Sequence, residues 1–428
     1  MREMKDSGIE WIGAIPQDWQ LSKIGSLYTQ RNEKVSDKDY QPLSVTMQGI
    51  LPQLATAAKT DDGDNRKLVR VGDFAINSRS DRRGSCGISP LDGSVSLINI
   101  ILTPRTAMHP GYYNWLFHTT LFADEFYKWG HGIVADLWTT RWQEMKSITV
   151  PVPEYAEQER IAAFLDAECA EIDAVLEKTR ASIEEYKKLK QAVITQAVTK
   201  GIRGDRPMKD SGIEWIGEIP AGVPISRVGL HFDIVLGKML CSAPVDDNYT
   251  LESYYCAADV HFEGLSNGEK KKMWFSPDEK EQYCVKNGDL LVVEGGAGAG
   301  GCAIAVSTDV PIYIQNSIMI VRSKGISNIR YLRYLLECLV KKGYIDVVCN
   351  KATIPHFTKD KLANVPFIVF SQSEQEEIAE YLNEKCAGID ALIAKKQQYL
   401  TEIENYKKSL IYEYVTGKKE VKTSVLAD

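Results

Sequence analysis

The sequence predicts an α+β fold: two mixed α/β domains separated by two long antiparallel coiled-coil helices, related by a pseudo-twofold internal repeat. Three observations predict it. The ten letters MKDSGIEWIG at residues 4–13 return unchanged at 208–217, and residues 158–201 align without a gap with 375–418. Between these repeated parts lie two blocks that share an order of predicted strands and helices but little sequence. The predicted boundaries are 1–153 (first domain), 154–203 (first helix), 204–372 (second domain), 373–418 (second helix) and 419–428 (C-terminal tail).

Length and composition are typical of a soluble protein with several domains. The chain has 428 residues, of which 44% are hydrophobic and 25% charged. No apolar run approaches the ~18 residues of a membrane span, and the N-terminus lacks a secretory core, so we expect no membrane contact and a cytoplasmic location. The nine cysteines stand singly without metal-ligand spacing, which indicates reduced, buried side chains and no metal site.

The net charge of −7 is unevenly distributed. Residues 154–177 and 374–390, at the starts of the two predicted helices, are strongly acidic, and the rest of the chain is therefore slightly basic. A basic remainder permits contact with nucleic acid, although it does not establish it.

The helix prediction for 158–198 and its repeat depends on heptad spacing. Apolar residues recur every seven positions in two registers four residues apart, which is typical of a coiled-coil seam. The predicted helix-helix interface comprises Leu165, Ile172, Leu176, Ile183, Tyr186 and Val193 in the first helix, and Leu382, Ile389, Ile393, Leu400, Ile403 and Leu410 in the second. Forty helical residues make a rod of roughly 60 Å, which suits a spacer. Alternatively, each helix packs only on its own block.

Each block contains strands followed by a helix. In the first block, 72–77 and 96–104 read as strands and 111–129 as a helix. In the second, 288–293 and 312–322 match the strands and 326–343 matches the helix. Apolar stretches with proline, ITVPVP (148–153) and VPFIVF (365–370), close the blocks. Equal scaffolds with different surfaces suit two modules that bind different ligands.

A loop after the first strand of each block is the leading binding candidate. In the first block it is SRSDRRGSCG (78–87), and guanidinium forks beside small polar groups are the chemistry that contacts base edges and phosphates. The candidate residues here are Asn77, Ser78, Arg79, Ser80, Arg82 and Arg83. A solvated turn would have the same composition. The counterpart GAGAGG (296–301) has GxGxxG spacing, but a strand pattern follows it where a dinucleotide site needs a helix.

A second pair of candidate segments lies near the end of each block, in HGIVADLWTTRW (131–142) and NKATIPHF (350–357). Both combine hydrogen-bonding side chains with aromatic residues, so a buried strand at the entry to the core is an equal alternative. The residues predicted to bind are Thr139, Thr140 and Arg141 in the first block, and Asn316, Lys351, Thr353 and His356 in the second. The lysine run 270–272 and Lys341 and Lys342 read as solvated faces more readily than as phosphate contacts.

Known catalytic motifs are not found. The chain has no amino-methyltransferase [DNS]PP[YFW] tetrad, no GxSxG and no P-loop, and PDEK at 277–280 lacks the remaining acids of a nuclease site. We therefore expect a non-catalytic protein without a cofactor of its own.

The repeated head MKDSGIEWIG, the helix starts QERIAAFLD (158–166) and QEEIAEYLN (375–383), and IDAVLEK with IDALIAKK together resemble the DNA-specificity subunit of Type I restriction-modification systems. One departure is AGVPISRV (221–228), which replaces the aromatic and basic stretch that QDWQLSKI (17–24) keeps. The resemblance extends over nearly the whole chain and is weakest inside the blocks.

This resemblance implies a reader of double-stranded DNA with two target-recognition domains, each reading one half of a bipartite sequence. It implies two modification subunits that dock along the helices and methylate adenine with S-adenosylmethionine, and restriction subunits that use ATP and magnesium and can join them. Two alternatives stay open from the residues alone. One is a coiled-coil adaptor whose blocks bind proteins, and the other is an enzyme in its own right, such as a single-chain nuclease.

Overall fold

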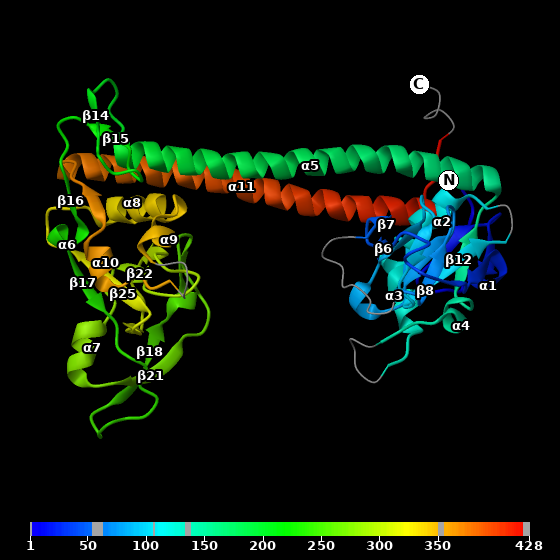
Figure 1. The fold of residues 1–428 in the computed structure, drawn as a ribbon, viewed down its shortest axis with the longest axis horizontal. Coiled ribbons are helices and arrows are strands. Elements are labelled where there is room, and N and C mark those ends of the chain that lie inside the picture. The colour runs from blue at the N-terminus through cyan, green and yellow to red at the C-terminus, as the bar shows by residue number, and fades with distance from the viewer. Residues whose placement is uncertain (1, 54–62, 106–107, 133–137, 350–354, 423–428) are drawn as a thin grey trace. The chain divides into compact units, whose positions relative to one another are not determined.

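The computed structural model describes residues 2–53, 63–105, 108–132, 138–349 and 355–422. The chain divides into two compact units: unit 1 is Met1–Arg180 with Gln397–Asp428, and unit 2 is Ala181–Lys396. Two long helices, α5 (Tyr155–Lys200) and α11 (Gln372–Val415), contribute to both units (Figure 1). Each unit therefore contains one block together with a part of each long helix.

Unit 1 is built on a four-stranded antiparallel sheet in the order β10-β9-β12-β4, flanked by a three-stranded sheet β11-β8-β5. Two hairpins, β1-β2 and β6-β7, and the pair β13-β3 complete it. The strands are β1 (Met4–Asp6), β2 (Ala14–Pro16), β3 (Gln20–Lys23), β4 (Tyr28–Arg31), β5 (Lys34–Val35), β6 (Leu43–Thr46), β7 (Gly49–Pro52), β8 (Arg66–Val69), β9 (Phe74–Asn77), β10 (Cys86–Ile88), β11 (Gly93–Val95), β12 (Asn99–Pro104) and β13 (Thr149–Val152). The short helices are α1 (Ile24–Leu27), α2 (Pro110–Phe117), α3 (Thr120–Lys128) and α4 (Trp142–Met145).

Unit 2 repeats this plan, with the four-stranded sheet β17-β25-β22-β23, the three-stranded sheet β21-β18-β24 and the pairs β14-β15, β16-β26 and β19-β20. Its strands are β14 (Met208–Asp210), β15 (Glu218–Pro220), β16 (Ile225–Arg227), β17 (Phe232–Leu236), β18 (Thr250–Tyr255), β19 (Val260–His261), β20 (Gly264–Leu265), β21 (Lys271–Phe275), β22 (Leu290–Val293), β23 (Cys302–Ile304), β24 (Tyr313–Ile314), β25 (Ile318–Ser323) and β26 (Pro366–Ile368). Its short helices are α6 (Val228–His231), α7 (Pro277–Tyr283), α8 (Ile329–Lys341), α9 (Tyr344–Val348) and α10 (Lys359–Ala363).

The predicted α+β fold with its repeat and its two long antiparallel helices is confirmed, with two local corrections. The single helix predicted over 111–129 is wrong, because the chain forms α2 and α3. The Thr119 hydroxyl donates to Leu116 O at 2.8 Å and accepts from Phe122 N, which ends one helix and caps the next. The strand predicted over 312–322 is likewise two strands, β24 and β25, each paired with a different neighbour. The divergent stretch 221–228 still forms β16, which pairs with β26 as β3 pairs with β13.

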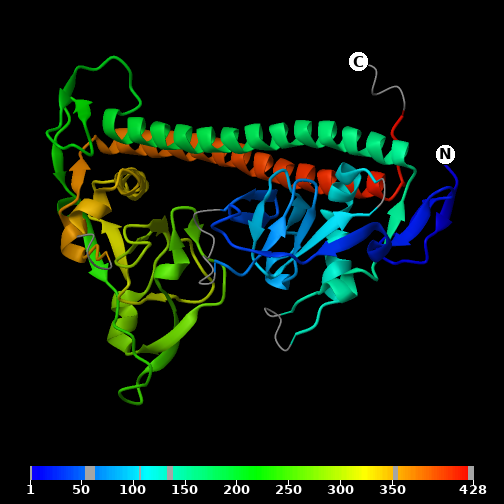
Figure 2. The ribbon, with the colours of Figure 1, turned by 45° about the vertical axis from the view of Figure 1, so that its right-hand side comes forward.

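Within each unit the two long helices lie side by side and run in opposite directions (Figures 1 and 2). In unit 1, Lys407 Nζ lies 2.6 Å from Asp173 Oδ1, and Arg180 lies 2.6 Å from Glu404. In unit 2, Lys190 Nζ lies 2.7 Å from Asp390 Oδ2. The pairs Asp173–Lys407 and Asp390–Lys190 occupy equivalent positions of the repeat, so they fix the same antiparallel register twice.

One glutamine ties the start of each long helix to its block. Gln158 donates to Pro153 O at 2.8 Å and accepts from His109 N at 2.9 Å. Gln375 repeats both bonds, to Phe370 O at 2.7 Å and from Asn328 N at 2.8 Å. The glutamine shared by the two repeats is therefore explained by its role where the helix begins. Glycines at positive φ, Gly201 and Gly417, follow the helix ends.

The hydrophobic core of each unit is continuous with its pair of helix segments. In unit 1, residues of α2 pack with Leu165 and Leu410, and in unit 2 residues of α8 pack with Val198 and Leu382. Figure 1 shows α8 beside the long helices of unit 2. Each block therefore packs on segments of both helices, and not on its own helix alone. Among the described residues, no helix combines the length and the apolar character that a membrane span requires.

Candidate nucleic-acid interface

The two predicted binding segments of unit 1 meet at one edge of its main sheet. The loop after β9 and the segment before α4 form a β-bridge between Arg79 and Thr139. Thr140 N donates to Ser78 O at 3.0 Å, and Ser80 N donates to Trp138 O at 3.0 Å. Backbone hydrogen bonds therefore join two segments that are about sixty residues apart in the sequence into one surface.

Unit 2 makes the same connection with different side chains. Gly295 forms a β-bridge with His356, Phe357 N donates to Glu294 O at 2.6 Å, and Gly296 N donates to Pro355 O at 3.1 Å. Gly295 and His356 occupy the positions of Arg79 and Thr139. Lys351 and Thr353 lie outside the described residues. The backbone frame is common to both units, whereas the groups that it displays differ.

An aspartate directly before the strand that leads to each junction ties that strand to its neighbours in the sheet. Asp73 accepts from Arg31 Nε at 2.7 Å and from Thr103 at 2.7 Å, and Asp289 accepts from Arg322 at 2.8 and 2.7 Å. The hydrogen bond to the carboxylate raises the pKa of both Arg31 and Arg322. Both loops then return to the sheet through a glycine at positive φ, Gly84 or Gly300, and a buried cysteine follows two residues later. These positioning residues were not predicted, although Asp-Φ-Φ-Φ before both loops was a readable signal.

Three of the predicted residues hold the frame in place. Asn77, Ser78 and Thr140 are buried, and each uses its side chain inside the unit. Asn77 Oδ1 accepts from Arg79 N at 3.0 Å, the Ser78 hydroxyl donates to Ile98 O, and the Thr140 hydroxyl donates to Phe126 O at 2.8 Å. Because these side chains are buried, they position the backbone of the surface and are not themselves available to a ligand.

The arginines of the loop differ in how far their guanidinium groups are engaged in contacts within the unit. Arg79 and Arg82 are exposed, and Arg82 lies 3.6 Å from the neighbouring Asp81. Arg83 forms an ion pair with Asp124 of α3 and lies over the ring of Tyr127, with its guanidinium 5.9 Å from the ring centroid. Tyr127 in turn donates its hydroxyl to Asn77 O at 3.1 Å. Arg79 and Arg82 are therefore better placed than Arg83 to contact a phosphate or a base edge.

Ser80, Thr139 and Arg141 complete the predicted set of unit 1. Ser80 and Thr139 are half-buried at the junction of the two segments. Arg141 is exposed and precedes α4, and its main-chain N–H donates to Glu144 Oε2 at 3.0 Å. Its guanidinium therefore extends from a backbone that the helix start fixes.

In unit 2, Asn316 lies beside the same junction. Its main-chain N–H donates to Lys238 O at 2.8 Å, and its Oδ1 accepts from Gln315 at 2.8 Å. The next residue, Ser317, accepts from Glu294 N at 2.8 Å. His356 is 61% exposed, with Nδ1 3.4 Å from Glu294 Oε2. The displayed groups of unit 2 are thus an imidazole, amides and a glycine loop in place of arginines.

The lysines of the run 270–272 have different surroundings. Lys270 is held by Asp259 at 3.1 Å and by two carbonyl oxygens, whereas Lys271 and Lys272 are exposed on β21. Lys271 and Lys272 therefore supply cationic surface, and Lys270 stabilises a turn.

The predicted helix-helix interface is covered throughout. Its residues are all buried or half-buried, whereas the intervening positions of both helices are mostly exposed. In unit 1, the tilted rings of Phe164 and Tyr414 also pack across the helices, with centroids 4.4 Å apart.

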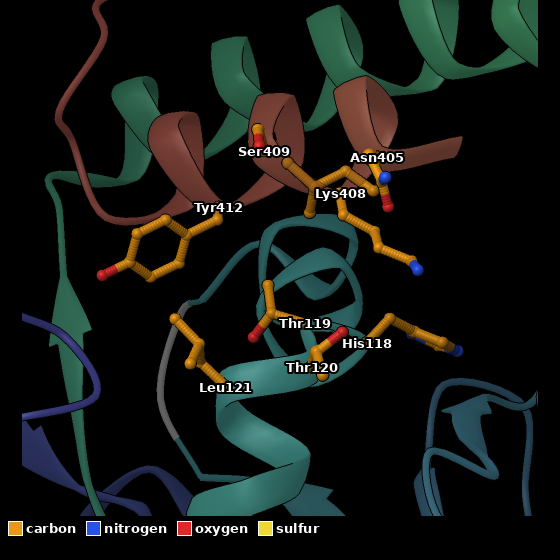
Figure 3. A pocket seen from close by; sticks show the side chains of 9 residues that line it. His118, Thr119, Thr120, Leu121, Asn405, Lys408, Ser409 and Tyr412 are labelled. Atoms are coloured by element: carbon orange, nitrogen blue, oxygen red, sulfur yellow. The ribbon is translucent and has the colours of Figure 1, made fainter. Parts of the chain in front are cut away.

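Two further kinds of candidate site are a metal-ligating cluster and a cavity. No group of three or more His, Cys, Asp or Glu side chains in the described part of the chain could hold a metal ion. Unit 1 has a half-open pocket of about 420 Å³ between the α2–α3 corner and α11 (Figure 3). It is lined by His118, Thr119, Thr120, Leu121, Asn405, Lys408, Ser409, Ile411 and Tyr412. Burial lowers the pKa of His118, and the lining offers that imidazole no carboxylate or thiol partner.

Known proteins share this sequence pattern and this fold. Residues 263–404 match the family model of the Type I restriction modification DNA specificity domain. The Type I restriction enzyme MjaVIII specificity subunit of Methanocaldococcus jannaschii is 24% identical over 95% of this chain and 94% of its own. The putative type I restriction enzyme MjaX specificity subunit of the same organism is 25% identical over 65% of this chain and 61% of its own.

Two solved structures have the same architecture. One is a chain from a structural study of complex assembly and conformational transition of the type I R-M system, with a TM-score of 0.74, 16% identity and coverage of 95% of this chain and 99% of that one. The other is the HsdS subunit from Thermoanaerobacter tengcongensis, with a TM-score of 0.54, 17% identity and coverage of 95% and 98%. Residues 263–404 therefore match the DNA specificity domain of Type I restriction-modification systems, and nearly the whole chain is similar in sequence and in fold to specificity subunits of such systems.

Proposed function

We propose that the chain is the DNA-reading subunit of a Type I restriction-modification complex and that each unit reads one half of a bipartite target. The observation that carries this proposal is the pair of equivalent junctions, Arg79 with Thr139 and Gly295 with His356. One backbone frame with two sets of displayed side chains suits two readers of different base sequences. Reading base edges needs side-chain donors and acceptors on a fixed backbone, which both junctions supply.

The chain acts without catalysis of its own in this proposal. Adenine methylation, with S-adenosylmethionine, belongs to two modification subunits, and ATP and magnesium belong to restriction subunits that can join the complex. The modification subunits dock along α5 and α11, whose starts are acidic.

Exposed apolar side chains beside the helix seam support this docking. Unit 1 carries Val175 on α5 with Tyr399 and Tyr406 on α11, and unit 2 carries Leu189 on α5 and Leu392 on α11. Val175 and Leu392 are equivalent in the repeat, as are Leu189 and Tyr406. Exposed apolar residues at equivalent positions are what a partner present in two copies requires.

A domain exchange tests the reading function. Residues 1–153 are replaced by the corresponding block of another family member, and methylated adenines are mapped by single-molecule sequencing in cells that hold the modification subunit. One half of the methylated sequence should change while the other half and the spacing stay constant. A change in both halves would contradict the assignment of one reader to each unit.

Salt dependence separates this function from that of a protein-binding adaptor. Phosphate contacts release counterions, so the affinity of the assembled complex for DNA should fall steeply as the salt concentration rises.

A second experiment tests whether the chain is an enzyme in its own right. Incubation of the purified chain alone with DNA, magnesium and S-adenosylmethionine should yield neither cleavage nor methylation.

A further inference from the structure

The ten-letter repeat MKDSGIEWIG forms the same hairpin in both units. In β1-β2, Met4 pairs with Pro16 and Asp6 with Ala14, and in β14-β15, Met208 pairs with Pro220 and Asp210 with Glu218. Here the hairpins of residues 4–16 and 208–220 are called head 1 and head 2. The turn explains part of the sequence identity between the two heads. Asp6 and Asp210 each accept a backbone N–H at 3.0 Å from the glycine two residues on, and both glycines have φ of +69°.

Packing against the rest of the unit does not explain the remaining identity, because the two heads pack against different groups. Trp11 is buried against Phe122 at 5.8 Å, whereas Trp215 is half-buried against Tyr344 at 6.3 Å. The carbonyl oxygen of Ile12 accepts from Lys418 at 2.6 Å and from Tyr412 at 2.9 Å.

In head 2 the acceptor is instead Trp215 O, which accepts a hydrogen bond from Lys342 Nζ at 2.8 Å. The core residue Trp19 that follows head 1 is also replaced, by Val223 in the second repeat. Inner contacts have therefore diverged while the ten letters have not.

The outward residues are identical although they have little intramolecular role. Met4 is 39% and Met208 36% exposed, which leaves more than a third of each apolar residue accessible to solvent. Glu10 is 94% exposed, with its carboxylate 3.8 Å from Lys128 Nζ, whereas Glu214 is exposed and forms no ion pair with the described residues. The Lys5 side chain donates to Gln17 O at 2.8 Å, but the Lys209 side chain forms no hydrogen bond or ion pair with the described residues. These three residue types are retained in both copies without a shared internal contact.

We propose that head 1 and head 2 each dock onto the same site on one of two copies of a single partner protein. The inference rests on the proposed function, which makes that partner the modification subunit. Methionine is a flexible apolar anchor for a partner pocket, and an exposed carboxylate beside it suits a basic group at the rim of that pocket. The carboxylates of Asp6 and Glu10 disfavour a phosphate backbone, so the occupant is a protein and not DNA.

Each head is held firmly enough to serve as a docking element. Just before the repeated letters, Arg2 pairs with Glu157 at the start of α5, and Arg206 pairs with Glu374 at the start of α11 at 2.7 Å. Both carboxylates precede the glutamine that joins the helix to its block. A fixed hairpin loses little conformational entropy on binding, which favours affinity.

The test counts modification subunits on the full chain by native mass spectrometry over a titration. The head 1 variant is Met4→Ser with Glu10→Lys, and the head 2 variant is Met208→Ser with Glu214→Lys. Glu3→Lys is the matched control, since Glu3 is exposed and adjacent but its counterpart is Pro207. The wild type and the control should bind two subunits. Each head variant should weaken one of the two sites at least about tenfold and leave the other unchanged.

Two equal, unchanged sites in both head variants would overturn the inference while leaving the proposed function intact. Loss of both sites together would also overturn it, because each head is assigned to one copy. A wild-type chain that binds no modification subunit would instead refute the proposed function. Unchanged circular-dichroism melting of the variants, whose altered side chains are exposed, separates a docking defect from unfolding.

Discussion

Tyr112 donates its buried hydroxyl to the main-chain oxygen of Val415 at 2.7 Å, which ties α2 to the end of α11 in unit 1. The equivalent bond in unit 2 runs from Tyr331 of α8 to Val198 O, at 3.0 Å, near the end of α5. Each block is thus attached to the end of the long helix that belongs to the other repeat. Burial raises the pKa of both phenols well above 10, so they remain donors at any physiological pH.

Removing either hydroxyl should destabilise its unit. Tyr112→Phe leaves the Val415 carbonyl without this donor, and we expect a loss of about 1 kcal/mol in the free energy of unfolding. Tyr331→Phe should cost at least as much, because its hydroxyl also lies 3.2 Å from Ile368 O. Urea unfolding measures both. Tyr399→Phe, at a half-exposed position, is the control, and an equal loss there would contradict this role for the buried bonds.

The loop arginines should differ in their effect on DNA binding. Arg79→Ala and Arg82→Ala remove exposed guanidinium groups, and each should cost ~1 to 3 kcal/mol where the group makes a bidentate base contact. Arg83→Ala should weaken binding less, because Arg83 is already paired with Asp124. Fluorescence anisotropy of the assembled complex with its target duplex measures these losses. Arg83→Ala as the most damaging change would show that the ion pair opens on DNA.

The features predicted correctly were those with a local or periodic signal. The first long helix was readable because heptad spacing repeats over its 46 residues. The division of 111–129 was missed because one hydroxyl, that of Thr119, ends α2 and caps α3 in an otherwise helical apolar pattern.

The candidate site was only partly predictable, for a different reason. Both segments were chosen from their composition. The bridge between Arg79 and Thr139, however, joins residues far apart in the sequence, and composition does not predict such a pairing. Composition also cannot tell a displayed hydroxyl from a covered one. Thr139 and Thr140 are adjacent and chemically equal, yet only Thr140 is fully buried with its hydroxyl on Phe126 O.

Leu382 and Leu392 of α11 provide a matched pair of substitutions. Leu382 is fully buried in the core of unit 2, and Leu392 is 44% exposed. Leu382→Ala should lower the free energy of unfolding by about 2 to 5 kcal/mol, whereas Leu392→Ala should change it by less than about 0.5 kcal/mol. Leu392→Ala should instead weaken binding of the modification subunit. Chemical denaturation and native mass spectrometry separate the two effects. A destabilised Leu392→Ala variant would argue that this side chain packs within the chain.

Glu337 of α8 should make the stability of unit 2 depend on pH. Its carboxylate is buried, lies 3.2 Å from Arg333, and has Oε2 without a hydrogen-bond partner among the described residues. Burial raises the pKa of Glu337 in spite of the arginine. The folded state therefore binds more protons than the unfolded state, so the contribution of Glu337 to stability falls as pH rises from the unfolded pKa through the folded one. The substitution Glu337→Gln removes this titration.

The difference in melting temperature, variant minus wild type, should therefore be larger at pH 7 than at pH 4. A difference that is constant between these pH values, or one that reverses, would show that the ion pair with Arg333 outweighs the cost of burial.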